Sequence, residues 1–378
     1  MNPVQDIEFM AEALRLAEKG LYTTHPNPRV GSVIVSDGRV VGRGFHRRAG
    51  EPHAEIVALA EAGEAARGAT VYVTLEPCSH QGRTPPCADA LIAAGVGRVV
   101  AAMVDPNPEV SGQGLERLRE AGIEVEVGVL EARARALNPG YVRRISGGLP
   151  YVRCKLAMSL DGRAAMRDGT SKWITSREAR RDAQFLRARS DAILTGSGTL
   201  AYDDPSLNVR LVPEDFPCDL TQEEIPQPLR VVLDSGLKMK PEARMLSLPG
   251  KTLILCTRFD ASRAGKLERA GGQVIPLQDE KGRIYLKDAL AYLGDRGLNE
   301  ILIEAGPTVA GQALHEGVLD EIVIYVAPHL MGDDARGLFH MPWIEKMEDR
   351  IALEIREIRQ IGDDLRVTAV PRKARGGN

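Results

Sequence analysis

The chain is poor in aromatic residues, which make up 4% of its 378 residues. Proteins that bind single-stranded nucleic acid stack its bases on aromatic side chains, and this sequence offers few of them. Basic and acidic residues number 49 and 52, and a net charge of −3 gives no general attraction to polyanions. We therefore expect no nucleic-acid partner.

The sequence also lacks any apolar run that approaches the roughly 20 residues needed to span a bilayer. Its first residues, 1–8, are acidic and polar and do not follow the pattern of a signal peptide. We therefore expect no membrane association and a cytoplasmic location. A length of 378 residues is sufficient for two domains of ordinary size.

Cysteine is scarce and odd in number, with five residues in the chain. Such a set is not typical of a disulfide framework. Cys154 and Cys256 lie in apolar runs, which predicts buried thiols, whereas Cys218 lies in a proline-rich segment with no evident partner.

Strands and helices alternate in the first part of the chain, which indicates a layered α/β domain. Helices are predicted at 4–18, 53–66, 87–94 and 130–137, and strands at 30–35, 40–45, 70–75 and 98–104. A further helix and strand are predicted between 104 and Gly128.

A turn-rich segment, 138–150, separates this part from the rest, and we place a boundary there, giving domains of 1–146 and 147–378. The alternation then begins again, and the segment 212–228 is expected to form a surface loop. Strands are predicted at 151–158, 192–195, 230–233, 252–256, 300–304 and 321–326.

One pattern of histidine and cysteine is the most informative feature that is present. His53 and Glu55 begin a predicted helix, Cys78 follows a predicted strand, and Cys87 begins another helix. Three such ligands suit zinc and leave a fourth position for water, whose pKa the metal lowers toward neutrality. Two helix N-termini near one point favour thiolates. We predict a catalytic zinc held by His53, Cys78 and Cys87, with Glu55 moving protons as in nucleobase deaminases.

A structural zinc is the alternative, and it would need a fourth protein ligand. His80 is the nearby candidate, although the gap between the two cysteines is longer than the two residues usual in such sites. We favour a position for His80 and Arg83 in the lining of a substrate pocket.

The segment Pro-Cys-Ser-His-Gln-Gly-Arg-Thr-Pro-Pro-Cys at 77–87, together with His-Ala-Glu at 53–55, resembles the bifunctional pyrimidine deaminase/reductase family of riboflavin biosynthesis. Segments 24–31, 44–46 and 105–108 are similar to that family too. Cytidine and transfer-RNA deaminases share the zinc core but have a shorter gap between the cysteines. The resemblance implies a cytidine-deaminase-like layered α/β domain at the N-terminus.

The same resemblance implies that His53, Cys78 and Cys87 hold Zn²⁺ and that Glu55 is the proton shuttle. It further implies contacts with the base and its sugar, from Asn27, His46, Asp105 and Asn107. Asparagine is common in proline-rich turns for local reasons, so a purely structural role for the two asparagines stays open.

Two glycine turns follow predicted strands in the second part of the chain, at 196–199 and 305–308. Bare backbone amides at such turns suit phosphate groups. The segment 196–201 fits Gly-x-Gly-x-x-Ala, but we expect residues 202–205 to follow it without a helix. That expectation argues against a Rossmann fingerprint and leaves a structural turn as the alternative.

Residues 148–370 resemble the reductase domain of the same family, which implies a C-terminal domain with a dihydrofolate-reductase-like fold. Ala305 stands where the family commonly has glycine, and we expect the turn to be unaltered. The resemblance implies an NADPH site formed by Ala157, Trp173, Thr199, Asp203, Gly306, Pro307, Thr308, Val309, Ala310, Gly311 and Gln312.

The resemblance also implies contacts with the sugar phosphate from Lys155, Ser171, Arg187, Leu207, Arg210 and Glu304. Guanidinium groups bind phosphate bidentately, which suits Arg187 and Arg210. Solvated arginines and a core position for Trp173 are the structural alternatives.

We therefore predict a two-step enzyme that acts on a phosphorylated pyrimidine and forms a homo-oligomer. The first step would remove the 2-amino group of 2,5-diamino-6-(5-phosphoribosylamino)pyrimidin-4(3H)-one. The second would reduce the ribosyl group with NADPH to give 5-amino-6-(5-phosphoribitylamino)uracil. The alternatives are a nucleoside or transfer-RNA deaminase with an appended reductase-like domain, and a zinc-bearing nucleic-acid-binding module.

Overall fold

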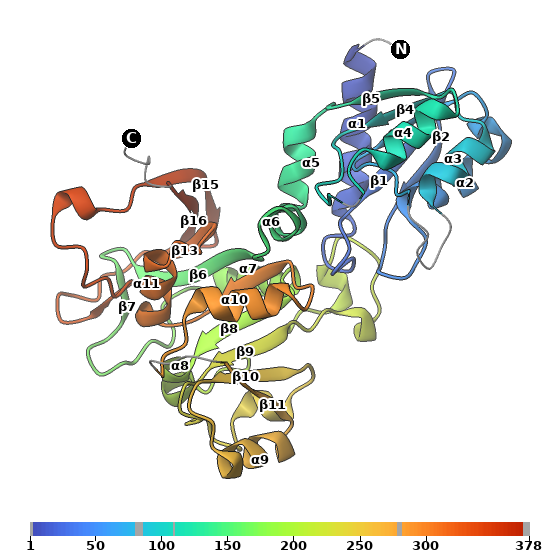
Figure 1. Ribbon diagram of the computed structural model, residues 1–378. Coiled ribbons are helices and arrows are strands. Elements are labelled where there is room, and N and C mark those ends of the chain that lie inside the picture. The colour runs from blue at the N-terminus through green and yellow to red at the C-terminus, as the bar shows by residue number, and fades with distance from the viewer. Residues whose placement is uncertain (1–2, 80–85, 109, 278–281, 373–378) are drawn as a thin grey trace. The chain divides into compact units, whose positions relative to one another are not determined.

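The computed structural model describes residues 3–79, 86–108, 110–277 and 282–372. By internal packing the chain divides into two compact units. The first comprises residues 1–148 and 213–224, and the second comprises 149–212 and 225–378. Each unit is a sheet with helices on both faces (Figure 1).

The first unit contains a five-stranded sheet in the order β2-β1-β3-β4-β5. Strand β1 is antiparallel to β2 and β3, whereas β3, β4 and β5 are parallel. Its elements are α1 Pro3–Glu18, β1 Gly31–Ser36, β2 Arg39–Phe45, α2 Ala54–Ala62, β3 Thr70–Val73, α3 Cys87–Ala94, β4 Arg98–Ala101, α4 Gln113–Glu120, β5 Glu124–Val127, α5 Glu131–Leu137 and α6 Pro139–Gly147.

Small side chains let the helices of this unit lie close to the sheet. Ala58 and Ala62 of α2, with α3 and α4, cover one face, while Ala13 of α1 and Ala134 of α5 cover the other. Burial of these faces is the main stabilising contribution of the layered arrangement.

The second unit contains a nine-stranded sheet in the order β11-β10-β9-β8-β12-β6-β13-β16-β15 and a small sheet of β14 and β7. The first seven strands in this order, β11, β10, β9, β8, β12, β6 and β13, are parallel to one another. Strands β16 and β15 are added antiparallel at the edge next to β13. The strands are β6 Tyr151–Ser159, β7 Arg163–Ala165, β8 Ala192–Gly196, β9 Leu229–Leu233, β10 Thr252–Cys256, β11 Gly272–Pro276, β12 Glu300–Ile303, β13 Glu321–Ala327, β14 Arg336–Gly337, β15 Leu353–Ile361 and β16 Asp364–Pro371.

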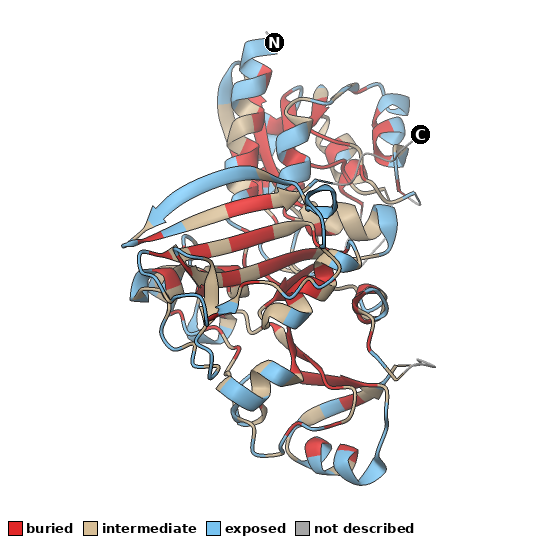
Figure 2. Cartoon of the chain, turned by 90° about the vertical axis from the view of Figure 1, so that its left-hand side faces the viewer, coloured by how far each residue is buried: buried red, intermediate tan, exposed pale blue. Residues whose placement is uncertain are grey.

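Helices cover both faces of the parallel part of this sheet. Helices α7 and α9 pack on one face, and α10 and α11 pack on the other. Figure 2 shows the central strands as buried, whereas the edge strand β15 is exposed along most of its length. The helices are α7 Arg177–Ala188, α8 Ser197–Asp203, α9 Ala261–Arg269, α10 Leu286–Gly294 and α11 Pro307–His315.

The predicted α/β layers are confirmed, and most predicted helices and strands agree with the structure within a few residues. The turn-rich segment before residue 148 contains the helix α6, and strands β7, β11, β14, β15 and β16 were not predicted. The prediction of buried thiols at Cys154 and Cys256 is confirmed, and all five cysteines are free.

The expectation that no helix follows the turn at 196 is wrong. Helix α8 begins directly after β8 and ends at Asp203, before Asp204 adopts a left-handed conformation and Pro205 follows. A helix this short shows no apolar periodicity in the sequence, which is why the pattern did not reveal it. The sequence after Gly196 therefore does not exclude a Rossmann fingerprint by lacking a helix.

A buried ion pair ties α1 to the sheet of the first unit. Asp6 accepts hydrogen bonds from the Tyr72 hydroxyl at 2.6 Å and from Arg98 Nη1 at 2.9 Å. The hydrogen bond from Arg98 is the main cause that lowers the pKa of Asp6, against the opposing effect of burial. The charged carboxylate therefore stabilises the fold.

We expect Asp6→Asn to lower the free energy of unfolding by about 2 kcal/mol at pH 7, because a charged hydrogen-bonded pair is lost. Since the folded pKa is depressed, the contribution of Asp6 is present above its ordinary value of 3.8. It is lost as the pH falls through the lowered pKa. Urea denaturation of both proteins from pH 7 downward measures this, and equal stabilities at pH 7 would contradict it.

Candidate functional site

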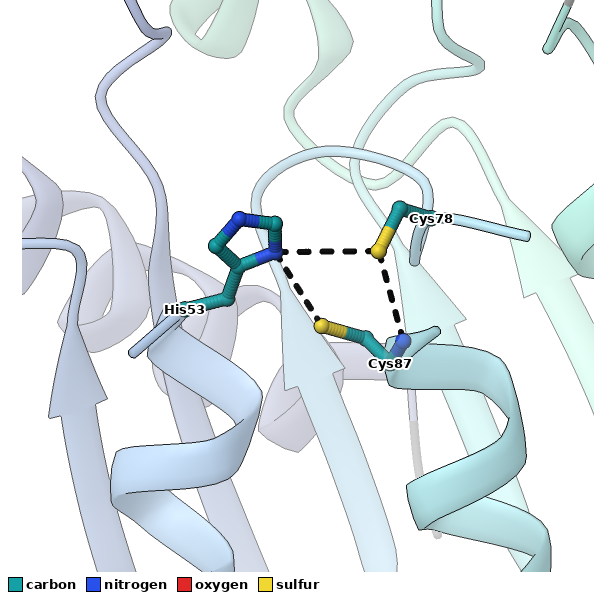
Figure 3. Close-up of side chains that lie close together, drawn as sticks. All are labelled: His53, Cys78 and Cys87. Atoms are coloured by element: carbon teal, nitrogen blue, oxygen red, sulfur yellow. Dashed lines mark hydrogen bonds between the residues drawn. The ribbon is translucent and has the colours of Figure 1, made fainter. Parts of the chain in front are cut away.

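Three predicted ligand side chains converge in the first unit. The Nδ1 atom of His53 lies 3.2 Å from Cys87 Sγ and 3.6 Å from Cys78 Sγ. The ligand atoms all lie within 4.8 Å of one another, and Figure 3 shows the three side chains pointing toward a common centre. This is the one such group of potential metal ligands among the described residues.

Local structure explains how each ligand reaches this centre. His53 is the N-cap of α2, Cys87 is the first residue of α3, and Cys78 follows the end of β3. Gly44 on β2 lets α2 lie close, because a Cβ atom there would be 2.1 Å from the carbonyl oxygen of Ala54. The two helix N-termini place positive dipole ends beside the sulfur atoms.

The electrostatics of the group favour a thiolate. A hydrogen bond from the Cys87 thiol, with further contributions from His53, lowers the pKa of Cys78 to about 4. The same hydrogen bond to Cys78, together with burial, raises the pKa of Cys87. One imidazole and two sulfur atoms form a donor set that fits zinc and is one ligand short of a closed structural site.

Glu55 lies one residue into α2 and is almost fully buried, at 3% exposure. Burial is the main cause that raises the pKa of Glu55 to about 7, and its carboxyl group also forms a hydrogen bond with Cys87. A carboxyl group beside the predicted ligands is therefore present in the position expected of a proton shuttle.

Two of the four predicted base and sugar contacts lie beside the metal ligands. Asn27 Nδ2 is 3.1 Å from His46 Nε2, and the ring centroid of His46 is 5.2 Å from that of His53. Burial lowers the pKa of His46, which favours the neutral imidazole near pH 7.

The other two predicted contacts, Asp105 and Asn107, lie between β4 and α4 and hold each other. The Asp105 carboxylate accepts hydrogen bonds from the backbone amide of Asn107 at 2.9 Å and from the Tyr141 hydroxyl at 2.9 Å. Tyr141 on α6 was not predicted, because its partner is 36 residues away and no local motif marks it. The predicted roles of His80 and Arg83 fall outside the described residues.

Charged groups gather in the second unit where Glu304 follows β12. Glu304 accepts a hydrogen bond from Arg187 Nη2 at 2.9 Å, and Arg187 Nη1 donates to the carbonyl oxygen of Asn208 at 3.0 Å. Burial is the main cause that lowers the pKa of Lys155. The nearby charge of Glu304 raises that pKa, and the charge of Arg187 lowers it. The predicted substrate residues Lys155, Arg187 and Glu304 are thus brought together.

Arg210 joins this group through Asn208, whose side-chain oxygen accepts from Arg210 Nη1 at 3.1 Å. Arg210 is exposed, whereas Arg187 is engaged by Glu304 and Asn208, so Arg210 presents more of its guanidinium to solvent. Leu207 has its side chain in the core against α7. Asn208 was missed because asparagine in a loop carries no distinctive signal.

The two glycine turns lie next to each other. Thr199 Oγ1 accepts a hydrogen bond from the Gly306 amide at 3.2 Å, and Ser171 Oγ donates to Asp203 at 3.4 Å. Trp173 is 71% exposed, which removes the alternative of a core position. It stacks on Arg180, with 4.5 Å between the guanidinium carbon and the ring centroid.

Residues 310–312 of the predicted cofactor loop lie within α11 and contact other parts of the protein. Ala310 is fully buried, and Gln312 donates hydrogen bonds to Ile284 and Glu316. Gly311 packs against the His340 carbonyl, to which a Cβ atom would be 2.1 Å. The start of the loop, 306–309, is therefore the part placed beside Thr199, and the roles of 310–312 stay predictions.

Comparison with known families matches both parts of the chain. Residues 3–103 match the cytidine and deoxycytidylate deaminase zinc-binding region, and residues 150–367 match the RibD C-terminal domain. These matches confirm the predicted pairing of a deaminase domain with a reductase domain.

Relatives match over nearly the whole length. The riboflavin biosynthesis protein RibD of Escherichia coli is 50% identical, over 96% of this chain and 98% of that protein. The structure of Acinetobacter baumannii RibD has a TM-score of 0.91 at 43% identity, covering 98% of this chain and 100% of that one. A Thermotoga maritima diaminohydroxyphosphoribosylaminopyrimidine deaminase/5-amino-6-(5-phosphoribosylamino)uracil reductase has a TM-score of 0.84 at 31% identity, covering 98% and 99%.

These relatives support the prediction of a riboflavin-pathway enzyme and not the alternative of a nucleoside or transfer-RNA deaminase. The chain belongs to the RibD family and is a bifunctional deaminase and reductase of riboflavin biosynthesis.

Proposed function

We propose that this chain deaminates 2,5-diamino-6-(5-phosphoribosylamino)pyrimidin-4(3H)-one and then reduces the ribosyl group, giving 5-amino-6-(5-phosphoribitylamino)uracil. The substrate class follows that of the Thermotoga maritima relative. The convergence of His53, Cys78 and Cys87 beside the buried Glu55 is the observation that carries the proposal. Residues 1–146 would carry the deaminase and 147–378 the reductase.

We assign His53, Cys78 and Cys87 as the ligands of Zn²⁺, which supplies activation of a water molecule when bound. Glu55 is the catalytic residue that receives a proton and delivers it to the ring nitrogen. Its burial keeps competing water away from that transfer. Asn27 and His46 orient the pyrimidine, and Asp105 and Asn107 contact its sugar.

In the second domain we assign the cofactor as NADPH, which supplies the hydride when bound. Thr199, Asp203 and Trp173 hold it together with residues 306–309, and β6 contributes Ala157. Exposed Arg210 takes the phosphate of the substrate, while the Glu304 carboxylate fixes Arg187 and faces Lys155. Ser171 and the backbone of Leu207 complete the substrate site.

A homo-oligomer is proposed from the exposed edge of the large sheet. Ile355 and Ile358 are each 58% exposed and lie opposite Ala369 and Val367, so they share one face. Acidic and basic residues alternate along β15, from 354 to 359, which makes an antiparallel pair of copies complementary in charge. A second copy of the chain is therefore the proposed occupant of this face.

None of the described helices is both long and apolar enough to cross a bilayer. A cytoplasmic location is proposed on the ground that all five cysteines are free thiols.

The central test is a coupled assay that follows ammonia release and NADPH absorbance together. We expect Glu55→Gln to retain one zinc per chain and to slow ammonia release at least about a hundredfold, because the proton transfer is lost. Reduction of the already deaminated substrate should be unchanged. A zinc chelator should stop the first step of the wild type.

Glu61→Gln is the matched control, because Glu61 is an exposed glutamate on the same helix. It should behave as the wild type. Normal ammonia release by Glu55→Gln, or by the chelated enzyme, would refute the assignment of the deaminase site.

Glu304→Gln should lower kcat/KM of the reductase about tenfold to a hundredfold, because the charged partner of the partly buried Arg187 is removed. Ammonia release should remain normal. Glu268→Gln, an exposed substitution on α9, is the control. A reductase unaffected by Glu304→Gln would remove Glu304 from the substrate site.

Ile355→Lys/Ile358→Lys should shift the protein to a smaller species, measured by size-exclusion chromatography with light scattering. Charge placed on the shared apolar face prevents its burial between copies. Phe259→Lys changes a similarly exposed apolar residue elsewhere and should leave the mass unchanged. A monomeric wild type at micromolar concentration would contradict the proposal.

A further inference from the structure

A buried carboxylate that the deaminase chemistry does not use lies two residues before the predicted ligand Cys78. Glu76 is 4% exposed. Its Oε2 atom accepts hydrogen bonds from the backbone amides of Asp105 at 3.0 Å and Gly112 at 2.9 Å, and its Oε1 atom accepts from that of Gly114 at 2.9 Å. Three donors converging on one side chain suit a carboxylate, which only accepts hydrogen bonds.

The backbone reinforces the same connection. The amide of Glu76 donates to the Met103 carbonyl at 3.0 Å. At Gly114 a Cβ atom would be 2.0 Å from the carbonyl oxygen of Pro77, so the first turn of α4 packs directly on the peptide that precedes Cys78. The ligand segment 76–78 is thus joined to residues 103–105 and 112–114 by hydrogen bonds and by close packing.

The segment held by Glu76 carries two of the four substrate contacts proposed for the deaminase. Asp105 is bound through its own amide, and Asn107 in turn donates its amide to the Asp105 carboxylate at 2.9 Å. Movement of the 103–114 backbone relative to Cys78 would therefore displace both side chains. Tyr141 donates a hydrogen bond to the Asp105 carboxylate. Among the described residues it forms no hydrogen bond with Glu76 or with the three backbone amides that donate to Glu76.

We propose that Glu76 is a positioning residue of the deaminase: it fixes residues 103–108 and 110–114, with Asp105 and Asn107, in register with the metal-ligand segment that carries Cys78. The proposal rests on the substrate roles given to Asp105 and Asn107 above. Glu76 acts through these residues and does not itself contact substrate.

Substitution of glutamine replaces one accepting oxygen with an NH₂ group, which opposes a backbone N–H donor. The side chains that hold substrate then lose their fixed position, while the metal ligands and Glu55 remain. We expect Glu76→Gln to raise KM for the diaminopyrimidine about tenfold and to change kcat less than about threefold. Glu76→Asp keeps the charge but shortens the side chain, and should give a smaller rise of the same kind.

The experiment uses the full-length zinc-loaded enzyme and its two variants, with Glu116→Gln as the control. Glu116 is on α4, close in sequence to the same segment, and its side chain is 66% exposed. For each protein, zinc per chain, KM and kcat for ammonia release, and reduction of the deaminated substrate are measured. Hydrogen exchange of peptides covering 103–115 reports on the backbone independently of turnover.

A raised KM with retained zinc, near-normal kcat, normal reductase activity and faster exchange at 103–115 supports the proposal. Unchanged KM and exchange would overturn it. Loss of zinc, or a fall in kcat alone, would also overturn it, because Glu76 would then act on the metal ligands. If Glu76→Gln does not fold, Glu76→Asp is judged by the same criteria, and failure of both to fold shows a purely structural role.

Failure of the proposed function is distinguishable from failure of this inference. Wild-type protein that releases no ammonia from the diaminopyrimidine would refute the substrate assignment. The exchange comparison would still decide whether Glu76 holds the 103–114 backbone.

Discussion

The deaminase half depends on one constraint, which is that two helix N-termini and one strand end meet at a point. α2 begins after His53, α3 begins at Cys87, and the chain leaving β3 supplies Cys78. The helix dipoles stabilise negative charge on the sulfur atoms without the help of a metal ion. Glycine and alanine on the facing surfaces set the distance between helix and sheet, so the positions of the ligands follow from the packing of the whole layer.

Buried or partly buried carboxylates organise both units in a similar way. Glu55 lies beside the sulfur ligands, Glu76 accepts hydrogen bonds from three backbone amides, and Glu304 forms an ion pair with Arg187. Each carboxylate has partners that offset the cost of removing it from water. The sites therefore gain fixed geometry from interactions that also satisfy buried polar groups.

The zinc ligands and Glu55 were predictable because their spacing places chemistry at the starts of helices and the end of a strand. Most of the parallel strands were predictable because they are short apolar runs, whereas β11 contains a glycine, a glutamine and a proline in five residues. The edge strand β15 was missed because its isoleucines stand three residues apart, at 355, 358 and 361, which breaks the alternation that marks a strand in sequence. The register shift between Ile355 and Glu357 brings Ile355 and Ile358 to one face. Tyr141 was missed because its partner Asp105 is distant in sequence. Asn208 was missed because it accepts from Arg187 through its backbone carbonyl, which any residue in that loop could do.

X-ray absorption at the zinc K-edge of the purified full-length protein tests the central claim most directly. The account predicts two sulfur neighbours at about 2.3 Å, one imidazole nitrogen at about 2.0 Å and one further light atom that does not belong to a side chain. Imidazole scattering from a single ring, unchanged by substitution of His80, would agree with an open catalytic site. Scattering from two rings, or a third sulfur, would show a closed structural site and contradict the account.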